Sequence, residues 1–307
     1  MRGAVPLIGL ALAAAPLAAQ NECSRLFDPA LRPGCELAVD AYHTAQRVGG
    51  IAISGGDPEP GAIGVLGGLG RAFASVRVTG VSAAIPNPDG SQGAISGLVP
   101  ASVVTGGFGI FRGLWGGLLA LDLLGSATLL PGTIDKLAVD KSATRIGGLP
   151  LGVGYGARIG IMNGRFPIPT VSVSVMRRTL PRLYFGDLPS GDHYAFDSDL
   201  KATNVRITAG MRLLALDVAA GIGFDHYSST AHLRWGTYGI STAEIGLPAT
   251  SSPRALFADA GLTLPAGKLV GEIGYQTGSD VQLGTNYSGF DPKAGHVFGG
   301  LGFRFGF

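Results

Sequence analysis

The sequence has 307 residues and a formal net charge of +2, and only 14% of its residues are charged, against roughly a quarter in an ordinary soluble domain. This balance gives no indication of a nucleic-acid partner. The mean hydropathy is +0.33, yet no run of about 20 apolar residues occurs beyond residue 20, which argues against membrane-spanning helices. An apolar chain with 51 glycines and no long apolar run is typical of a transmembrane β-barrel.

The first 19 residues have the features of a secretory signal peptide. Arg2 precedes an apolar stretch over residues 4–15, and small residues predict cleavage after Ala19. A short buried helix is the alternative interpretation. Cys23 is not preceded by a convincing lipoprotein signal, so we do not expect a lipid anchor there.

Residues 20–47 form a separate predicted segment with the only two cysteines, Cys23 and Cys35. Two cysteines in an exported chain most simply form one disulfide with each other, and two free thiols are the alternative. Neither cysteine has the neighbouring ligands of a zinc site, and we expect no bound metal. Apolar residues at helical spacing predict one short amphipathic helix over 36–47, which would act as a plug or a periplasmic cap.

The rest of the chain, 48–307, shows the two-residue alternation of β-strands. In "TVSVSVMRR", for example, three valines alternate with two serines over residues 171–175. The sequence therefore predicts an all-β fold, a closed antiparallel transmembrane β-barrel.

The number of strands follows from counting back from the C-terminus. Eight strands lie between about 113 and 307, and residues 63–83 give a ninth. Because bacterial barrels have even strand numbers, we place a tenth strand at 47–55. The prediction is about ten strands, with eight or twelve as alternatives because residues 84–112 are glycine-rich and ambiguous.

The connections between the predicted strands alternate in length. Outer-membrane barrels have short periplasmic turns and long external loops, so the pattern predicts that the C-terminal strand ends at the periplasm. The short connections lie at 163–169, 213–216 and 264–268, and the long ones lie at 180–201, 235–253 and 279–292.

The closing residues "FGGLGFRFGF" put Phe303, Phe305 and Phe307 on one face of a strand. This stretch resembles the C-terminal strand of bacterial outer-membrane proteins, which ends in Phe with aromatics at alternate positions. The resemblance is at the level of the class. It implies a Gram-negative outer-membrane location and recognition of the three phenylalanines by the barrel-assembly machinery. The apolar face would meet lipid, where unpaired backbone groups are costly, so the sheet must close.

One short motif predicts a chemical activity. The residues "HYSS" at 226–229 resemble the His-x-Ser of the outer-membrane lipid A deacylases, which implies His226 as the base and Ser228 as the nucleophile. That family places an acid soon afterwards, whereas the next acid here is Glu244. The alternative is that His226 and the neighbouring tyrosine are amphipathic residues at the membrane interface. The residues at 225–227 read Asp-His-Tyr, and the same triplet at 192–194 is expected in a solvated loop.

Nine charged residues are predicted to face the barrel interior. They can form a structural ladder of ion pairs or line a pore and set its selectivity, and the two roles are compatible. A tight turn at 214–215 predicts an Arg212–Asp217 ion pair near the periplasmic end, with Arg304 at the same rim. The nine residues are Arg77, Asp122, Arg158, Arg206, Arg212, Asp217, Asp259, Glu272 and Arg304.

These features predict an outer-membrane β-barrel that acts as a narrow channel or transporter for a small or apolar solute. One alternative is a lipid A deacylase-like hydrolase that uses His226 and Ser228. The other is a structural or surface-binding barrel that acts through its external loops. No phosphate-binding glycine loop and no cofactor are predicted. The expected partners are membrane lipid, the assembly machinery and a small solute, and no nucleic acid.

Overall fold

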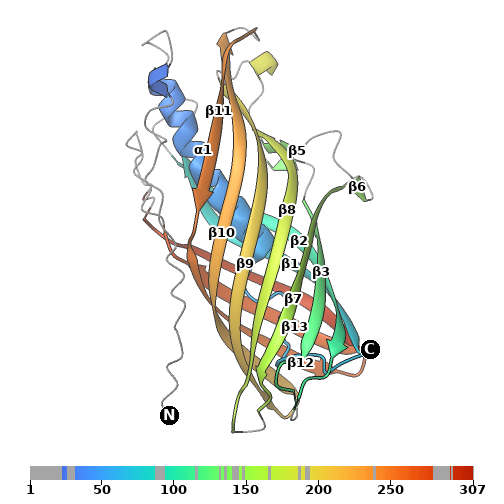
Figure 1. The fold of residues 1–307 in the computed structure, drawn as a ribbon. Helices are drawn as coiled ribbons and strands as arrows, with labels where there is room; N and C mark the ends of the chain where they lie inside the picture. The colour runs from blue at the N-terminus through green and yellow to red at the C-terminus, as the bar shows by residue number, and fades with distance from the viewer. Residues whose placement is uncertain are drawn as a thin grey trace, which may run out of the picture.

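The computed structural model of the chain is a closed antiparallel β-barrel with one helix inside it (Figure 1). The predicted signal peptide and Phe307 lie outside the described residues, and so do residues 191–193. The structure describes residues 23–306 except 26–31, 87–93, 115–116, 131–132, 135–136, 140–144, 147–148, 165–166, 186–187, 191–193, 238–239, 279–290 and 292.

Ten strands form the wall among the described residues, as the sequence predicts, and each pairs antiparallel with its neighbours. The barrel closes through the pairing of β1 with β14 and of β7 with β8. The ten strands are β1 (Ala72–Pro86), β2 (Ala94–Phe111), β3 (Leu121–Leu129), β7 (Leu149–Met162), β8 (Thr170–Phe185), β9 (Tyr194–Leu213), β10 (Leu216–Thr237), β12 (Arg254–Leu264), β13 (Gly267–Gln276) and β14 (His296–Gly306).

Further elements lie outside this ten-strand wall. An additional strand, β11 (Ile240–Ser251), pairs with the last part of β10. The others are β4 (Thr133–Ile134), β5 (Leu137–Val139), β6 (Arg145–Ile146) and two 3-10 turns, η2 (Cys23–Arg25) and η4 (Leu188–Ser190).

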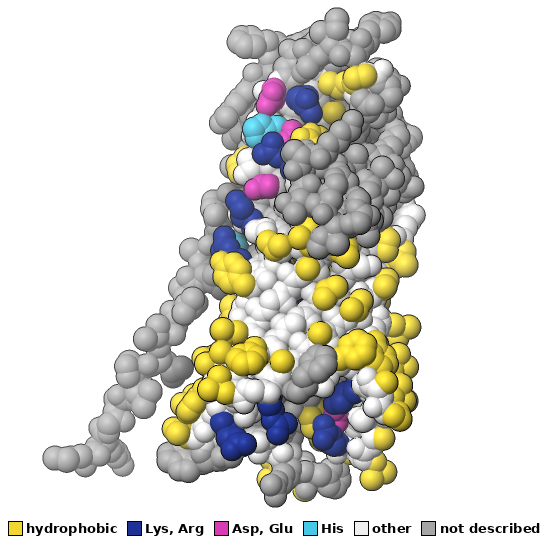
Figure 2. All heavy atoms as spheres, turned by 90° about the vertical axis from the view of Figure 1, so that its right-hand side faces the viewer, with side chains coloured by type: hydrophobic (Ala, Val, Ile, Leu, Met, Phe, Trp, Pro, Cys, Tyr) yellow, Lys and Arg dark blue, Asp and Glu magenta, His cyan; other side chains and the backbone are white. Residues whose placement is uncertain are grey.

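Alternation decides which side chains enter the barrel. Along β12 buried and exposed residues alternate, with Phe257 and Asp259 inside and Leu256 60% exposed on the outside. On the face shown in Figure 2, hydrophobic side chains form a broad belt, with basic side chains below it and charged side chains above it. This is the outward face that a lipid bilayer requires.

The two ends of the barrel differ. The predicted short connections lie at one end, which we call the turn end, and include the two-residue turn Leu214–Ala215 between β9 and β10. Leu214 has a φ of 58°, which the tight turn requires. The C-terminus lies at the turn end, and β9, β10 and β11 rise past the other strands at the opposite end, the loop end (Figure 1).

The predicted tenth strand at 47–55 is wrong, because these residues lie almost entirely in helix α1 (Arg32–Ser54). The helix is also longer than the predicted 36–47. Its C-terminal half is buried and mostly small or apolar on all sides, including Val48, Ile51 and Ile53. Such a run does not distinguish a strand from an enclosed helix. The tenth strand is β2, in the segment whose sequence was ambiguous.

Two of the predicted long loops are also corrected. Much of 180–201 belongs to β8 and β9, and most of 235–253 belongs to β10 and β11. Beyond the hydrophobic belt the outward side chains are polar, so the strands continue without the apolar alternation that marks a membrane strand. Arg182 and Arg234, for example, face Asp197 there at 3.2 and 3.9 Å. Part of the third predicted loop, 279–292, lies outside the described residues.

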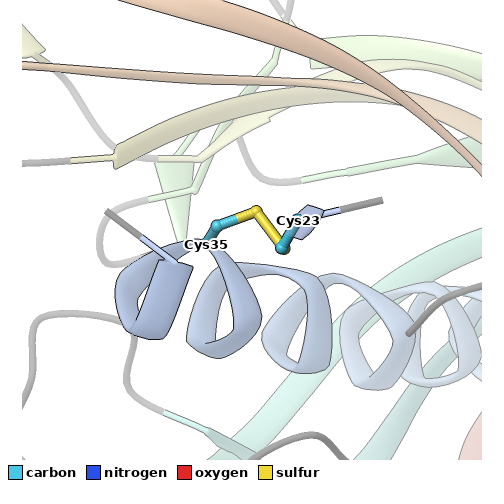
Figure 3. The surroundings of a disulfide bond; sticks show 2 residues. All are labelled: Cys23 and Cys35. Carbon is cyan, nitrogen blue, oxygen red and sulfur yellow. A yellow bond between two sulfur atoms is a disulfide. The ribbon is translucent and has the colours of Figure 1, made fainter. Parts of the chain in front are cut away.

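Helix α1 is anchored at the loop end by the predicted disulfide between Cys23 and Cys35, which is confirmed (Figure 3). Both cysteines are buried in a cluster that includes Phe196, Trp235 and Leu247 from β9, β10 and β11. Further along, the helix packs on the interior of the wall. Among the residues that the structure describes, no helix is both long and apolar enough to cross a membrane.

Candidate functional site

The interior of the barrel is occupied by α1 and by residues 55–71, which lead from the end of the helix to the start of β1. We call residues 55–71 the strap. It has little regular structure, so its backbone groups need partners from elsewhere. The wall supplies many of them through charged side chains.

Arg206 and Glu272 hold the first turn of the strap from two sides. Arg206, which is 1% exposed, donates from Nε to the carbonyl oxygen of Gly56 at 2.8 Å and from Nη2 to that of Gly55 at 2.9 Å. Glu272 accepts the backbone N–H groups of Gly56 and Asp57 at 2.9 and 2.7 Å. A cation on the carbonyls and an anion on the amides match the polarity of the peptide groups, so these charge-assisted hydrogen bonds fix the turn.

Glu59 connects the middle of the strap to opposite parts of the wall. Its fully buried carboxylate forms ion pairs with Arg158 of β7 and Arg304 of β14. Arg158 also contacts Asp122 of β3 at 3.2 Å. A buried charge without a partner costs several kcal/mol. The carboxylate of Glu59 therefore stabilises Arg158 and Arg304 by neutralising part of their positive charge.

The lower strap is held in the same way. The backbone N–H of Gly61 donates to Asp259 Oδ1 at 2.6 Å, and that of Leu66 donates to Asp122 Oδ2 at 2.9 Å. A Cβ atom placed on Gly61 would lie 2.5 Å from Val270 Cγ1 and 3.0 Å from the Cα of Gly261, so strap and wall are in direct contact.

The predicted Arg212–Asp217 ion pair is confirmed at the turn end. The two residues are opposite in the β9–β10 hairpin, and Arg212 Nε lies 2.8 Å from Asp217 Oδ1. Lys268 of β13 forms a second ion pair with the same carboxylate. A cavity of 370 Å³ at this end is lined by strap residues that include Arg71 and by Arg212, Lys268 and Arg304 of the wall, and it is predominantly basic.

Helix α1 makes polar contacts with the interior as well. Tyr227 of β10 is fully buried, and its hydroxyl lies 3.0 Å from Ser54 Oγ. The same hydroxyl donates to Asp225 Oδ2 at 3.1 Å and accepts from Gln276 Nε2 at 2.7 Å. Asp225 in turn accepts from Arg206 at 2.5 Å. One hydrogen-bonded network therefore joins the end of the helix to the arginine that holds the strap.

The structure places the nine predicted lumen residues on the inward side of the wall, where seven are buried. Arg304 is 12% exposed and Arg212, at the rim, is 57% exposed. Many of them bind α1 or the strap. Sequence reasoning missed several members of the network. Asp225 and Arg178 have the same parity as inward neighbours, so the alternation could have identified them. Asp57 and Glu59 lie in a segment that was expected to be an inter-strand connection.

The predicted hydrolytic pair is not brought together. His226 and Ser228 both lie on the outward face of β10, as their spacing predicts. His226 Nδ1 lies 3.0 Å from Ser252 Oγ, and among the contacts of the described residues none joins His226 to Ser228. Glu244 contacts His232 at 2.9 Å instead. In the described part of the chain, no group of three or more His, Cys, Asp or Glu side chains could hold a metal ion.

No protein-family model matches the chain, and a search of curated proteins found no match. Three solved structures illustrate the similarity of fold. The outer-membrane protease OmpT from Escherichia coli is 9% identical over 77% of this chain and 96% of that chain, with a TM-score of 0.40. The translocator domain of the autotransporter NalP from Neisseria meningitidis is 11% identical over 94% and 99%, with a TM-score of 0.39.

The third structure is Ail, the attachment invasion locus protein of Yersinia pestis. It is 13% identical over 77% of this chain and 99% of that chain, with a TM-score of 0.30. These likenesses concern the fold alone. The closed antiparallel wall and its outward hydrophobic belt are the features of a transmembrane β-barrel. In outer-membrane barrels the short turns lie on the periplasmic side.

Proposed function

We propose that the protein is an occluded outer-membrane barrel that acts at its outer surface, through the disulfide-linked N-terminal segment and the extended β9–β11 sheet. The observation that carries this proposal is the occupation of the lumen by α1 and the strap, which contact the wall from the loop end to the turn end. Of the functions that the sequence suggests, the surface-binding barrel agrees best with this geometry.

The energetics of the interior support an occluded barrel. Arg158, Arg206, Arg304 and Glu272 have their partners in the strap or in the network next to it. Withdrawal of the strap would leave these charges without those partners, at a cost of several kcal/mol for each one that water does not reach. The closed arrangement is therefore the stable one, and the outer end is the part left free to contact other molecules.

Conductance across a planar lipid bilayer tests the proposal. We expect the refolded full chain to show no steady conductance, and a variant that lacks residues 32–66 to conduct ions. If that variant does not refold, a triple variant, Asp225→Asn, Asp259→Asn and Glu272→Gln, loosens the strap without a deletion. Asp199→Asn, on the outward face of β9 where the side chain is 32% exposed, is the control. Steady conductance of the full chain equal to that of the deletion variant would contradict occlusion.

A gated channel is the second candidate, and one observation favours it. The strap is held mainly by charged and polar groups, and a basic cavity of 370 Å³ lies beside it at the turn end. Ion pairs can exchange partners when a competing charge arrives, whereas a close-packed apolar plug cannot. Conductance that appears only when an anionic solute is added on the periplasmic side would support this candidate.

A further inference from the structure

A stripe of polar residues crosses the outward face of four neighbouring strands, directly beyond the hydrophobic belt toward the loop end. On each strand the change from apolar to polar occurs between two successive outward residues, and basic side chains and histidine dominate the polar positions. The last apolar residues on β8, β9, β10 and β12 are Val175, Val205, Phe224 and Leu256, and the residues that follow are Arg177, Thr203, His226 and Arg254.

The register makes this stripe continuous. Arg177 is opposite Thr203 on β9, and Thr203 is opposite His226 on β10. The next outward residue on β9 is Lys201, which is opposite Ser228. Since adjacent strands lie about 4.8 Å apart, the side chains from Arg177 to His226 cover a patch on the order of 10 Å wide. We call these residues, with Arg254, the basic stripe.

The positive charge of the stripe is only partly neutralised. Within the described part of the chain no acidic side chain pairs with Arg177 or Arg254, and both are exposed. Lys201 lies 3.2 Å from Asp199, in a pair that is open to solvent on both sides. The His226 ring is fixed through Nδ1 by Ser252, which leaves Nε2 for a further partner. The stripe therefore presents several donors to one anion.

We propose that the basic stripe binds the phosphate groups of an anionic lipid in the outer leaflet. Arg177 and Arg254 supply charge-assisted hydrogen bonds to phosphate oxygens, and the hydroxyls of Thr203 and Ser228 can donate between them. The acyl chains of the same lipid lie on the apolar residues immediately below the stripe. The surface thus matches both halves of one amphipathic molecule, and this role accounts for His226 and Ser228 without catalysis.

A second charged cluster farther from the belt provides the comparison. Arg182, on the same strand as Arg177, lies 3.2 Å from Asp197, and Arg234 lies 3.9 Å from the same carboxylate. That cluster carries its own counter-charge and has no hydrophobic belt directly beneath it. We therefore expect it to contribute little to lipid binding, which makes Arg182 a matched control for Arg177.

Binding of diphosphorylated lipid A to the refolded full chain in neutral detergent, followed by native mass spectrometry, tests this proposal. Phosphatidylcholine is the zwitterionic comparison. We expect lipid A to be retained in preference to phosphatidylcholine, and its affinity to fall about ten-fold in Arg177→Ala. Arg177→Lys should restore part of the affinity, and Arg182→Ala should change it less than about two-fold. Arg177 points outward, so these variants fold as the parent does.

Three results would overturn the proposal. One is equal retention of lipid A and phosphatidylcholine, and another is an equal loss of affinity in Arg182→Ala and Arg177→Ala. The third is complete displacement of lipid A by inorganic phosphate at a similar molar concentration, because the site would then recognise phosphate without the lipid. None of these results depends on whether the lumen is occluded.

Discussion

Arg206 of the wall and Gly56 of the strap are joined by a 2.8 Å hydrogen bond from the arginine Nε to the glycine carbonyl oxygen. The two residues are 150 positions apart in the sequence, and Arg206 is 1% exposed. A residue that could have lined an open pore is instead bound to the segment that fills it. Glu272, Asp259 and Arg158 are also bound to strap residues. The charged side chains of the lumen therefore hold the chain's own N-terminal part in place.

The close contact between α1 and Tyr227 gives the first prediction. A Cβ atom on Gly50 would lie 2.7 Å from three atoms of the buried Tyr227 ring, whereas one on Gly49 would meet only Leu200 Cδ2, at 3.1 Å. Alanine is favoured over glycine in a helix by about 1 kcal/mol at either position. We expect Gly49→Ala to leave stability unchanged or higher, and Gly50→Ala to lower it by about 1–2 kcal/mol, as measured by denaturant unfolding in lipid vesicles. Equal stabilities for the two variants would show that the helix does not lie against Tyr227.

The second prediction concerns Asp217, which is 1% exposed and carries two cationic partners. Asp217→Asn removes the charge that Arg212 and Lys268 share. Because Arg212 is 57% exposed, water compensates part of the loss, and we expect a destabilisation of about 1–3 kcal/mol. Asp199→Asn removes the acid of an exposed pair with Lys201 and should cost less than about 1 kcal/mol. Urea unfolding of both variants in vesicles measures the difference, and similar values would mean that the buried pair contributes no more than a surface one.

The position of the disulfide predicts which end of the barrel carries the N-terminal segment. Cys23 is buried beside Trp235 and Leu247, at the end opposite the short turns. An epitope inserted directly before Cys23 should therefore bind antibody on intact cells. An epitope inserted in the 214–215 turn should bind only after the outer membrane is permeabilised. The reverse pattern of labelling would mean that the barrel is oriented the other way.

The C-terminal strand gives a prediction about assembly. Phe303 and Phe305 pack at 4.8 Å between ring centroids, and the resemblance to outer-membrane proteins implies that Phe307 completes the assembly signal. Deletion of Phe307 should lower the amount of protein in the outer membrane far more than its synthesis. Quantitative immunoblots of membrane fractions and whole cells give the ratio. Normal membrane levels of the truncated chain would remove this role from Phe307.

The sequence predicted the barrel well because lipid on one side and a charged interior on the other impose strict alternation on each strand. It also predicted the Arg212–Asp217 pair, since the two residues are close in sequence and a tight turn fixes their register. It could not predict α1 over 47–54. An enclosed helix needs no polar face, so Val48 and Ile51 carry no helical signature.

The contacts of the strap could not be predicted from the sequence, for a related reason. They join residues of an irregular segment to side chains far away in the sequence, such as Gly61 and Asp259, which are 198 positions apart. No local pattern marks a glycine whose backbone N–H binds a distant carboxylate. Hence the sequence predicted which charges face inward and left open whether they face water or protein.

A disulfide cross-link between strap and wall tests most directly whether the lumen is filled. A Cβ atom on Gly64 would lie 3.5 Å from the Cβ of Thr170, close to the mean separation of about 3.8 Å in disulfides. In membranes from cells that produce the Gly64→Cys/Thr170→Cys variant, we expect a spontaneous cross-link. Faster migration on a denaturing gel without reductant and peptide mapping by mass spectrometry would detect it.

The matched control is Gly67→Cys/Thr170→Cys, because a Cβ atom on Gly67 has no neighbour within 4 Å. We expect a cross-link in the first variant and two free thiols at the engineered positions of the second. If both engineered cysteines of the Gly64→Cys/Thr170→Cys variant react fully with a maleimide after denaturation, the strap does not lie in the lumen and the occluded barrel is contradicted.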